Sequence, residues 1–310
     1  MNFKSSDRSN IKKIYLKFLK KKEVAGKPLI DKVGKLNTFY LPLSEWIYST
    51  YKKDNKIKII GLSGGQGAGK STITGILKFL LKKKYGLELC VFSIDDFYKT
   101  KVERNKMSKN IHPLFLTRGV PGTHDINLIN KTFKNLKKKT FKQVLIPRFN
   151  KLTDDRFKKS KWIKVKKRPS VIIFEGWCVG ARAEANKTLK KSINSMEKAN
   201  DNKLVWRKYV NQQLKTKYKK LYSQLNCMIY LKAKNFSLLQ KWRLKQEHKL
   251  WLKTKKKGGH KIMSKGDVIN FMQTYQRITQ NMLKNMSKYA SIILNLNSNH
   301  QIKSAVYKSK

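Results

Sequence analysis

Acidic residues are scarce in this sequence, in which 18 Asp and Glu stand against 72 Lys and Arg and give a formal net charge of +54. There are only three cysteines, Cys90, Cys178 and Cys227, too few and too far apart for a disulfide framework or a metal knuckle. No apolar run approaches the roughly 20 residues that cross a bilayer. These scarcities exclude a disulfide-stapled domain and a transmembrane helix, and we expect a cytoplasmic globular protein with buried thiols.

The surplus of positive charge is of a size typical of proteins that bind nucleic acid or an anionic membrane. The lysines, however, are spread over nearly every helical stretch, and only 10 basic residues are Arg, the residue that makes bidentate contacts in nucleic-acid readers. This pattern favours solvated Lys-rich faces, so we expect neither a specific nucleic-acid partner nor a membrane. A basic nucleic-acid-binding ATPase remains an alternative.

The chain divides into a basic start and one long domain. Residues 1–35 are polar and Lys-rich, with few Arg and no apolar signal core, and they predict a loosely attached helical extension rather than a transit peptide. Residues 36–310 form the predicted single domain. Its first element is a helix over 41–53, for which Ser44 is a possible N-cap.

Apolar segments of strand length alternate with helical patterns through the rest of the chain. The predicted strands cover 57–62, 89–94, 171–176, 227–233 and 291–296, and the predicted helices cover 70–84, 236–253 and 266–288. Strands that are apolar throughout and separated by helices predict an α/β fold with a parallel sheet buried on both faces. Residues 98–170 interrupt this alternation of strands and helices, and such interruptions usually carry the substrate site. This segment is called the interruption below.

The segment GLSGGQGAGKST matches GxxxxGK[ST] between a predicted strand and a predicted helix. In this motif, backbone N–H groups wrap the phosphates of a nucleotide, while Lys70 reaches the β and γ phosphates and the Ser71 hydroxyl can ligate Mg²⁺. The residues predicted to bind the nucleotide are Gly64, Gly65, Gln66, Gly67, Ala68, Gly69, Lys70, Ser71 and Thr72. Nucleotide binding is the most specific prediction that the sequence makes.

Three carboxylates follow predicted strands and are expected at the edge of the sheet beside this loop. In FSIDDFYKT, Asp95 and Asp96 end one strand, where a carboxylate can accept the proton of an attacking hydroxyl. We assign Asp95 as this base and Asp96 as a helix cap or a partner of Mg²⁺ and its waters. Glu175 ends VIIFEG and is a candidate for Mg²⁺, with a purely structural strand end as the alternative.

Arginines gather in the interruption and on later helices. A planar guanidinium binds phosphate or carboxylate in two places, so Arg118, Arg148 and Arg156 suggest a small anionic acceptor. Structural pairing is the alternative for any of these arginines. The acids available for it are Asp125, Asp154, Asp155 and Glu247, and the other arginines placed near the site are Arg182, Arg207, Arg243 and Arg277.

The remaining polar signals are weaker. His112 and His124 have no companions at metal-ligand spacing, so we predict substrate contact or loop structure for them rather than a metal site. Residues 241–251 are amphipathic, and their tryptophans are predicted to pack. The Lys- and Gly-rich segment after them resembles a mobile lid, and the whole lid is predicted over 243–265.

Taken in order, the motifs GLSGGQGAGKST, SIDDFY, TRGVPGTHD, IPRFNK with DDR, IIFEGWCVG, WRKYVNQQL, KWRLKQEHKL and MSKGDVINFMQTYQRITQNM resemble the D-glycerate 3-kinase group of P-loop kinases, related to pantothenate kinase, uridine kinase and phosphoribulokinase. The resemblance covers about 36–300. It implies a three-layer fold around a mostly parallel five-stranded sheet in the order 2-3-1-4-5.

The resemblance also implies roles for residues. Asp95 would be the catalytic base, and Lys70, Mg²⁺ and Arg243 would stabilise the charge on the transferred phosphoryl group. The residues expected to contact the acceptor are Arg118, His124, Asp125, Arg148, Lys151 and Arg156. The implied reaction uses ATP and Mg²⁺ to convert D-glycerate into 3-phospho-D-glycerate.

The sequence departs from the group at Phe149-Asn150, where Tyr-Asp is frequent, and at SMEKANDN, where the group has an acidic stretch. These departures concern the acceptor, so a kinase of pantothenate, uridine or a sugar phosphate is an alternative, as is an ATP-binding protein that transfers nothing. The sequence gives neither the oligomeric state nor the role of the basic start.

Overall fold

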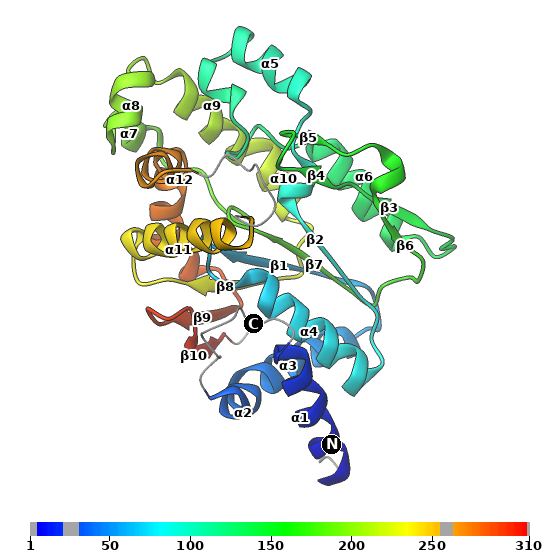
Figure 1. The fold of residues 1–310 in the computed structure, drawn as a ribbon. Helices are drawn as coiled ribbons and strands as arrows, with labels where there is room; N and C mark the ends of the chain where they lie inside the picture. The colour runs from blue at the N-terminus through cyan, green and yellow to red at the C-terminus, as the bar shows by residue number, and fades with distance from the viewer. Residues whose placement is uncertain (1–4, 21–30, 255–262, 309–310) are drawn as a thin grey trace.

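The computed structural model describes residues 5–20, 31–254 and 263–308, and its centre is a six-stranded sheet (Figure 1). The order of its strands is β10-β9-β8-β1-β7-β2. Their bounds are β1 Lys58–Gly64, β2 Leu89–Ser93, β7 Val171–Gly176, β8 Cys227–Lys232, β9 Ile292–Leu296 and β10 Ile302–Tyr307. All but β10 run parallel, and numbered in chain order they confirm the predicted order 2-3-1-4-5. The antiparallel edge strand β10 was not predicted.

Two hydrophobic clusters cover the two faces of this sheet. Neighbouring residues of β1 point to opposite faces, and Ile59 belongs to one cluster while Ile60 belongs to the other. Helices α3 (Leu41–Lys52), α4 (Lys70–Tyr85) and α11 (Phe236–Thr254) contribute to the cluster of Ile60. Helices α6 (Ile126–Lys137) and α9 (Val205–Gln213) contribute to the cluster of Ile59, and α12 (Lys265–Asn285) contributes to both. The sheet is therefore buried on both faces, as its uninterrupted apolar strands predicted.

Local capping explains where several helices begin. Helix α5 (Lys101–Asn110) has a capping box between Thr100 and Glu103, and α12 has one between Ser264 and Asp267. The N-cap prediction for Ser44 was wrong. Helix α3 already begins at Leu41, and the buried hydroxyl of Ser44 donates to the Leu41 carbonyl at 2.8 Å from inside the first turn.

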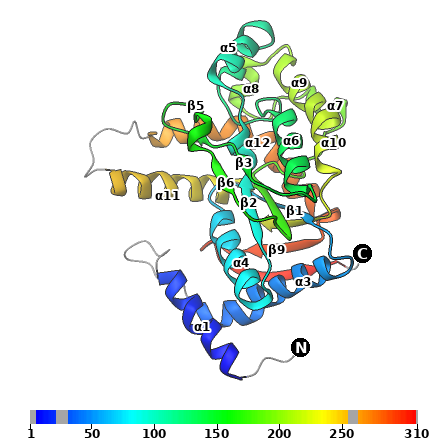
Figure 2. The same ribbon diagram turned by 90° about the vertical axis from the view of Figure 1, so that its right-hand side faces the viewer.

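The basic start of the chain is packed more closely than the sequence predicted. Helix α1 (Ser5–Lys20) lies beside α4 (Figure 2) and buries Tyr15 and Leu19 against Ile76 and Leu80. A loose attachment was therefore wrong for α1, because its apolar stripe packs against α4. The short helix α2 (Lys32–Lys35) and the π-helical turn η1 (Leu36–Tyr40) lead from there into α3.

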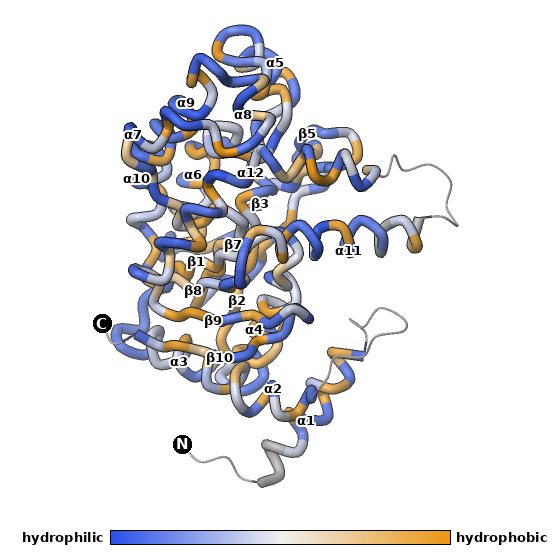
Figure 3. Tube along the Cα trace, turned by 90° about the vertical axis from the view of Figure 1, so that its left-hand side faces the viewer, coloured by the Kyte–Doolittle hydropathy of each residue, from blue (hydrophilic) through white to orange (hydrophobic). Residues whose placement is uncertain are grey.

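The interruption, residues 98–170, contains α5, α6 and two small antiparallel sheets. One joins β3 (Val144–Ile146) to β6 (Ile163–Val165), and the other joins β4 (Phe149–Asn150) to β5 (Asp155–Arg156). In Figure 3, the hydrophobic colouring gathers on the central strands, while α5 is mainly hydrophilic. Of the predicted lid, 243–254 belong to helix α11, 255–262 lie outside the described residues, and 263–265 lead into α12. No helix in the described ranges is long and apolar enough to cross a membrane.

Candidate active site

The phosphate loop, residues 64–71, connects β1 to α4 and contains all the predicted nucleotide-binding residues except Thr72, which follows it in α4. Gly67 and Gly69 have φ of 76° and 86°, the left-handed region that other residues rarely adopt. The Lys70 ammonium donates to the carbonyls of Gly64 at 2.8 Å and Gly65 at 3.2 Å. The lysine thus folds back over its own loop, where a bound polyphosphate would offer it stronger acceptors. Nucleotide binding by these residues stays a prediction, and the geometry suits it.

Asp95 lies in the single turn η2 (Ile94–Phe97), directly after β2. Its Oδ1 accepts a hydrogen bond from the Tyr98 hydroxyl at 2.9 Å, and its Oδ2 lies 3.4 Å from the Lys151 ammonium. Burial acts to raise the pKa of Asp95, but the positive charge of Lys151 and the Tyr98 hydrogen bond help to bring it below the usual range. The carboxylate is therefore ionised at neutral pH and able to receive a proton.

Asp96 turns toward the interruption instead. Its Oδ1 accepts from the Phe149 amide at 3.3 Å, and burial raises the pKa of its carboxyl. The predicted capping role of Asp96 was wrong, because the Ser93 side chain caps η2 by accepting from the Asp95 amide and Thr100 caps α5. Contact of Asp96 with Mg²⁺ and its waters stays a prediction.

Glu175 is the acid nearest the phosphate loop in the sheet, where it pairs in register with Leu62 of β1 and Ser93 of β2. Its Oε2 is buried and has no hydrogen-bond partner among the described residues. Burial raises the pKa of Glu175, although Lys70 acts in the opposite direction. A buried carboxylate oxygen without a partner fits a cation or its coordinated water, and Ser71, the other candidate ligand, is exposed at the start of α4.

No group of three or more His, Cys, Asp and Glu side chains in the described ranges could enclose a metal ion. The residues present fit Mg²⁺, which commonly takes one or two carboxylates and leaves its other positions to phosphates and water. Glu175 and Ser71 are the residues that would hold it.

Several predicted acceptor residues are engaged in pairs with acids. Asp125 accepts from the Leu128 amide at 3.0 Å as the N-cap of α6, and its other oxygen lies 3.3 Å from Arg156. Arg156 also donates to the Tyr98 carbonyl at 2.8 Å. This pair therefore fixes the loop around Asp95, and structural pairing, the alternative to acceptor binding, accounts for the contacts of both residues.

Arg118 forms an ion pair with Asp154, which also pairs with Arg104 at 2.8 Å. Arg104 was not among the arginines that the sequence placed near the site. Its guanidinium is fully buried and also donates to the carbonyls of Lys99 and Leu116, so it ties the segments before and after α5 to the β4–β5 hairpin.

Lys151 and Arg148 are exposed cations within the segment 98–170. The Lys151 side chain is 62% exposed, and the Arg148 guanidinium lies 5.6 Å from the centre of the Phe157 ring. Arg243 of α11 pairs with Glu247 one turn later at 2.5 Å, which is the structural alternative considered for it.

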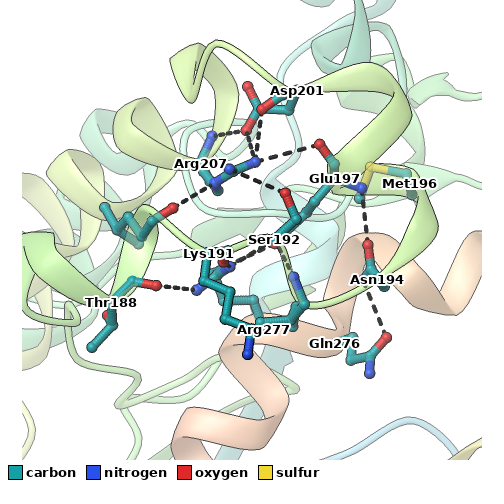
Figure 4. Close-up of polar contacts among 12 residues, drawn as sticks. Thr188, Lys191, Ser192, Asn194, Met196, Glu197, Asp201, Arg207, Gln276 and Arg277 are labelled. Carbon is teal, nitrogen blue, oxygen red and sulfur yellow. Dashed lines mark hydrogen bonds and ion pairs between the residues drawn. The ribbon is translucent and has the colours of Figure 1, made fainter.

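Arg207 and Arg277 do not belong to the site, contrary to the sequence-based placement. They lie in a buried ionic network shown in Figure 4. Arg277 of α12 pairs with Glu197 at 2.6 Å, and Arg207 of α9 pairs with Asp201 at 3.1 Å. The network ties α7 (Asn186–Leu189) and α8 (Ser195–Asn200) to α12, so its guanidiniums stabilise the fold.

His124 lies in the centre of the site and is 2% exposed. Its ring stacks on Tyr98 with centroids 4.6 Å apart, and its Nδ1 lies 2.6 Å from the Tyr218 hydroxyl. Burial lowers the pKa of His124 to about 4, against the raising effect of Asp95, so the imidazole is neutral at physiological pH. Its Nε2 has no hydrogen-bond partner in the described part of the chain.

Sequence reasoning missed three tyrosines of this site. Tyr98 follows Asp95 by three positions in SIDDFY, a spacing that could have been read as a contact within one turn. Tyr275 of α12 donates to the Arg118 carbonyl at 3.4 Å and packs edge-on against Trp177. No local signal marks Tyr218 or Tyr275, because their partners lie far away in the sequence.

A phosphate loop at the end of the central strand β1, with Glu175 at the end of the neighbouring strand β7 and Asp95 directly after β2, the next strand along, defines the class of P-loop kinases. Residues 59–216 match the sequence model of the Phosphoribulokinase / Uridine kinase family. The uncharacterized kinase mug58 of Schizosaccharomyces pombe is 34% identical over 232 residues, which cover 72% of this chain and 80% of that protein. The chain belongs to the Phosphoribulokinase / Uridine kinase family.

Two further relatives concern the group that the sequence resembles. The chloroplastic D-glycerate 3-kinase of Arabidopsis thaliana is 29% identical over 265 residues, which cover 79% of this chain and 54% of that protein. The solved structure of D-glycerate 3-kinase from Cryptococcus neoformans var. grubii aligns with a TM-score of 0.72 at 23% identity, over 87% of this chain and 99% of that one. This second likeness shows a shared fold.

Proposed function

We propose that this kinase transfers the γ-phosphoryl group of ATP to D-glycerate and releases ADP and 3-phospho-D-glycerate. The observation that carries the proposal is the ionised Asp95 carboxylate beside the phosphate loop, oriented by Tyr98 and next to the exposed cation of Lys151. A base and a neighbouring cation suit an acceptor with a hydroxyl and a carboxylate. The similarity to the Arabidopsis D-glycerate 3-kinase supports this choice of acceptor.

The residues divide the work of this reaction. Asp95 accepts the proton of the primary hydroxyl while that oxygen bonds to the γ phosphorus and the bond to the leaving ADP oxygen breaks. Lys70 leaves the loop carbonyls to neutralise charge on the transferred group. Lys151 and Arg148 attract the acceptor carboxylate. Glu175 and Ser71 would hold Mg²⁺, which would neutralise charge on the phosphates.

A cavity of about 480 Å³ at the carboxyl ends of β8 and β9 leaves room for the nucleoside part of ATP. Residues after β8 and β9 and the first turns of α11 line it, among them Asn235, Leu238 and Asn297. The opposite side of α11 packs on the loop, because a Cβ added at Gly65 would lie 2.5 Å from Leu239. The cavity and the loop therefore share α11 as a common wall.

The proposal is tested by measuring ADP release from purified protein with ATP, Mg²⁺ and a panel of acceptors. We expect turnover with D-glycerate and much less with glycerol, which lacks the carboxylate, or with L-glycerate. Phosphorus–proton coupling in NMR spectra of the product distinguishes the 3-phosphate, coupled to two protons, from the 2-phosphate, coupled to one. ADP release only with pantothenate, uridine or ribulose 5-phosphate would overturn the choice of acceptor, and none with any acceptor would overturn transfer.

A further inference from the structure

The hydroxyl of Tyr218 determines which nitrogen of His124 carries the proton. Its oxygen accepts a hydrogen bond from the Gly122 amide at 2.9 Å, so its own hydrogen must be donated elsewhere. Within the described residues, its one available acceptor is His124 Nδ1, at 2.6 Å. Burial raises the pKa of Tyr218 well above its usual range, so the phenol keeps that hydrogen. Nδ1 therefore carries no proton, and in a neutral imidazole the proton is on Nε2.

The Nε2–H group is a buried donor that is left without a protein acceptor. Its atom is inaccessible to solvent and has no hydrogen-bond partner among the described residues. The ring is stacked on Tyr98, whose hydroxyl contacts Asp95, and the charge of Asp95 acts on the imidazole. Unsatisfied buried polar groups are rare and require an explanation, and a catalytic role is one recognised explanation. Here the donor lies in the neighbourhood of the base.

We propose that Tyr218 holds His124 as the Nε2–H tautomer so that Nε2–H donates a hydrogen bond to an oxygen of the phosphoryl acceptor. The identity of that acceptor as a hydroxy acid rests on the proposed function above. His124 keeps its proton throughout the reaction, and the proton of the attacking hydroxyl goes to Asp95. In this tautomer, Nε2 already carries a proton and Nδ1 accepts from Tyr218, so His124 cannot act as the base. Asp95 is then the one of the two that can. Tyr218 does not touch the acceptor and is a positioning residue.

The local structure around Tyr218 suits this role. It ends the π-helical turn η5 (Leu214–Tyr218), which connects α9 to α10 (Lys219–Tyr222). Turns of this kind are rare and frequently occur at functional sites. The same hydroxyl fixes the Gly122 amide, so one side chain sets both the tautomer of His124 and the path of the loop that leads to it.

The tautomer can be measured without any acceptor, by ¹⁵N NMR of the full chain labelled at histidine. We expect the His124 Nε2 signal in the protonated, pyrrole-type range and Nδ1 in the unprotonated, pyridine-type range, assigned by the signals lost in His124→Gln. Tyr218→Phe should replace this pattern with a mixture of tautomers. Tyr222→Phe is the matched control, since its hydroxyl donates to the Cys178 carbonyl at 2.8 Å from the same segment, and it should leave the pattern unchanged.

Kinetics test the contact with the acceptor. We expect Tyr218→Phe to lower kcat/KM for the acceptor by roughly five- to tenfold, with the KM for ATP unchanged, whereas Tyr222→Phe changes neither. His124→Gln keeps an N–H donor near the place of Nε2 and should retain more activity than His124→Leu. Equal loss in the Gln and Leu variants would overturn the donor role.

These outcomes separate the inference from the proposed function. If the unmodified protein has Nδ1 protonated, the inference is wrong whatever the protein phosphorylates. If the Nε2–H tautomer is found but D-glycerate is not turned over, the proposed acceptor is wrong and the tautomer stands. Thermal unfolding of each variant identifies loss of folding, and where Tyr218→Phe does not fold, the spectrum of the unmodified protein and the His124→Gln variant decide.

Discussion

Gly67 of the phosphate loop and His300 of the turn between β9 and β10 are joined by a hydrogen bond of 2.8 Å across 233 positions of the sequence. Because the Gly67 partner is a carbonyl oxygen, His300 Nδ1 is the donor. The imidazole also stacks on Trp242 of α11 with centroids 4.3 Å apart, and the Trp242 indole donates to the Ser298 carbonyl at 2.9 Å. The end of the sheet thus supports the loop that would hold the phosphates.

His300→Phe is expected to raise the KM for ATP roughly threefold to tenfold and to leave kcat nearly unchanged. The phenyl ring keeps the stack on Trp242 but has no donor for the Gly67 carbonyl, and one net hydrogen bond accounts for a change of that size. Steady-state kinetics at saturating acceptor measure it. An unchanged KM for ATP would show that the loop keeps its shape without this contact.

Asp95→Asn is expected to lower kcat by roughly 10²-fold or more while the Kd for ATP stays nearly the same, because the amide keeps the shape of the side chain but cannot receive a proton. Calorimetric titration with ATP and the ADP-release assay measure the two quantities. Tyr98→Phe keeps the carboxylate and removes one hydrogen bond to it, so its loss should be only about threefold to tenfold. Turnover of Asp95→Asn close to that of the unmodified protein would assign the base elsewhere.

The predictability of the fold follows from burial. A strand such as β7 is buried along nearly its whole length, so its sequence is an uninterrupted apolar run that can be recognised without a structure. Strand β10 is an edge strand in which only Ile302 is buried, and its mixed sequence IKSAVY carries no such signal. The close packing of α1 was missed for another reason, since it depends on contacts of Tyr15 and Leu19 with α4, which lies more than 50 positions further along the chain.

The site was predicted in part, and the division has a physical cause. The phosphate loop and Asp95 are encoded locally, by glycines with special backbone angles and by an acid after a strand. Which acid each arginine finds is decided by tertiary packing, as when Arg104 meets Asp154 across 50 positions. The role of Tyr218 depends on a π-helical turn and on a partner 94 positions away, so the sequence shows only one tyrosine among 13.

Glu175→Gln is expected to stabilise the nucleotide-free protein increasingly as pH rises, while it weakens the dependence of activity on Mg²⁺. Burial raises the pKa of Glu175 in the folded state above its value in the unfolded chain, so the folded state binds more protons and loses stability as pH rises through that interval. The amide has no charge to bury and escapes this loss. Urea unfolding at pH 5 and pH 8 measures it, and a stability difference that shrinks with rising pH would contradict the assignment.

Arg277→Met is expected to lower the free energy of unfolding by about 3–5 kcal/mol, because it leaves the buried Glu197 carboxylate, whose side chain is 1% exposed, without its bidentate partner. The double variant Arg277→Met with Glu197→Met removes both charges and should recover much of that loss. Arg168→Ala is the surface control, since its guanidinium donates to the carbonyls of Lys137 and Lys138 at the exposed end of α6, and it should cost less than about 1 kcal/mol. Urea unfolding of the four proteins forms the comparison. A double variant as unstable as Arg277→Met would show that packing, and not the unpaired carboxylate, determines the cost.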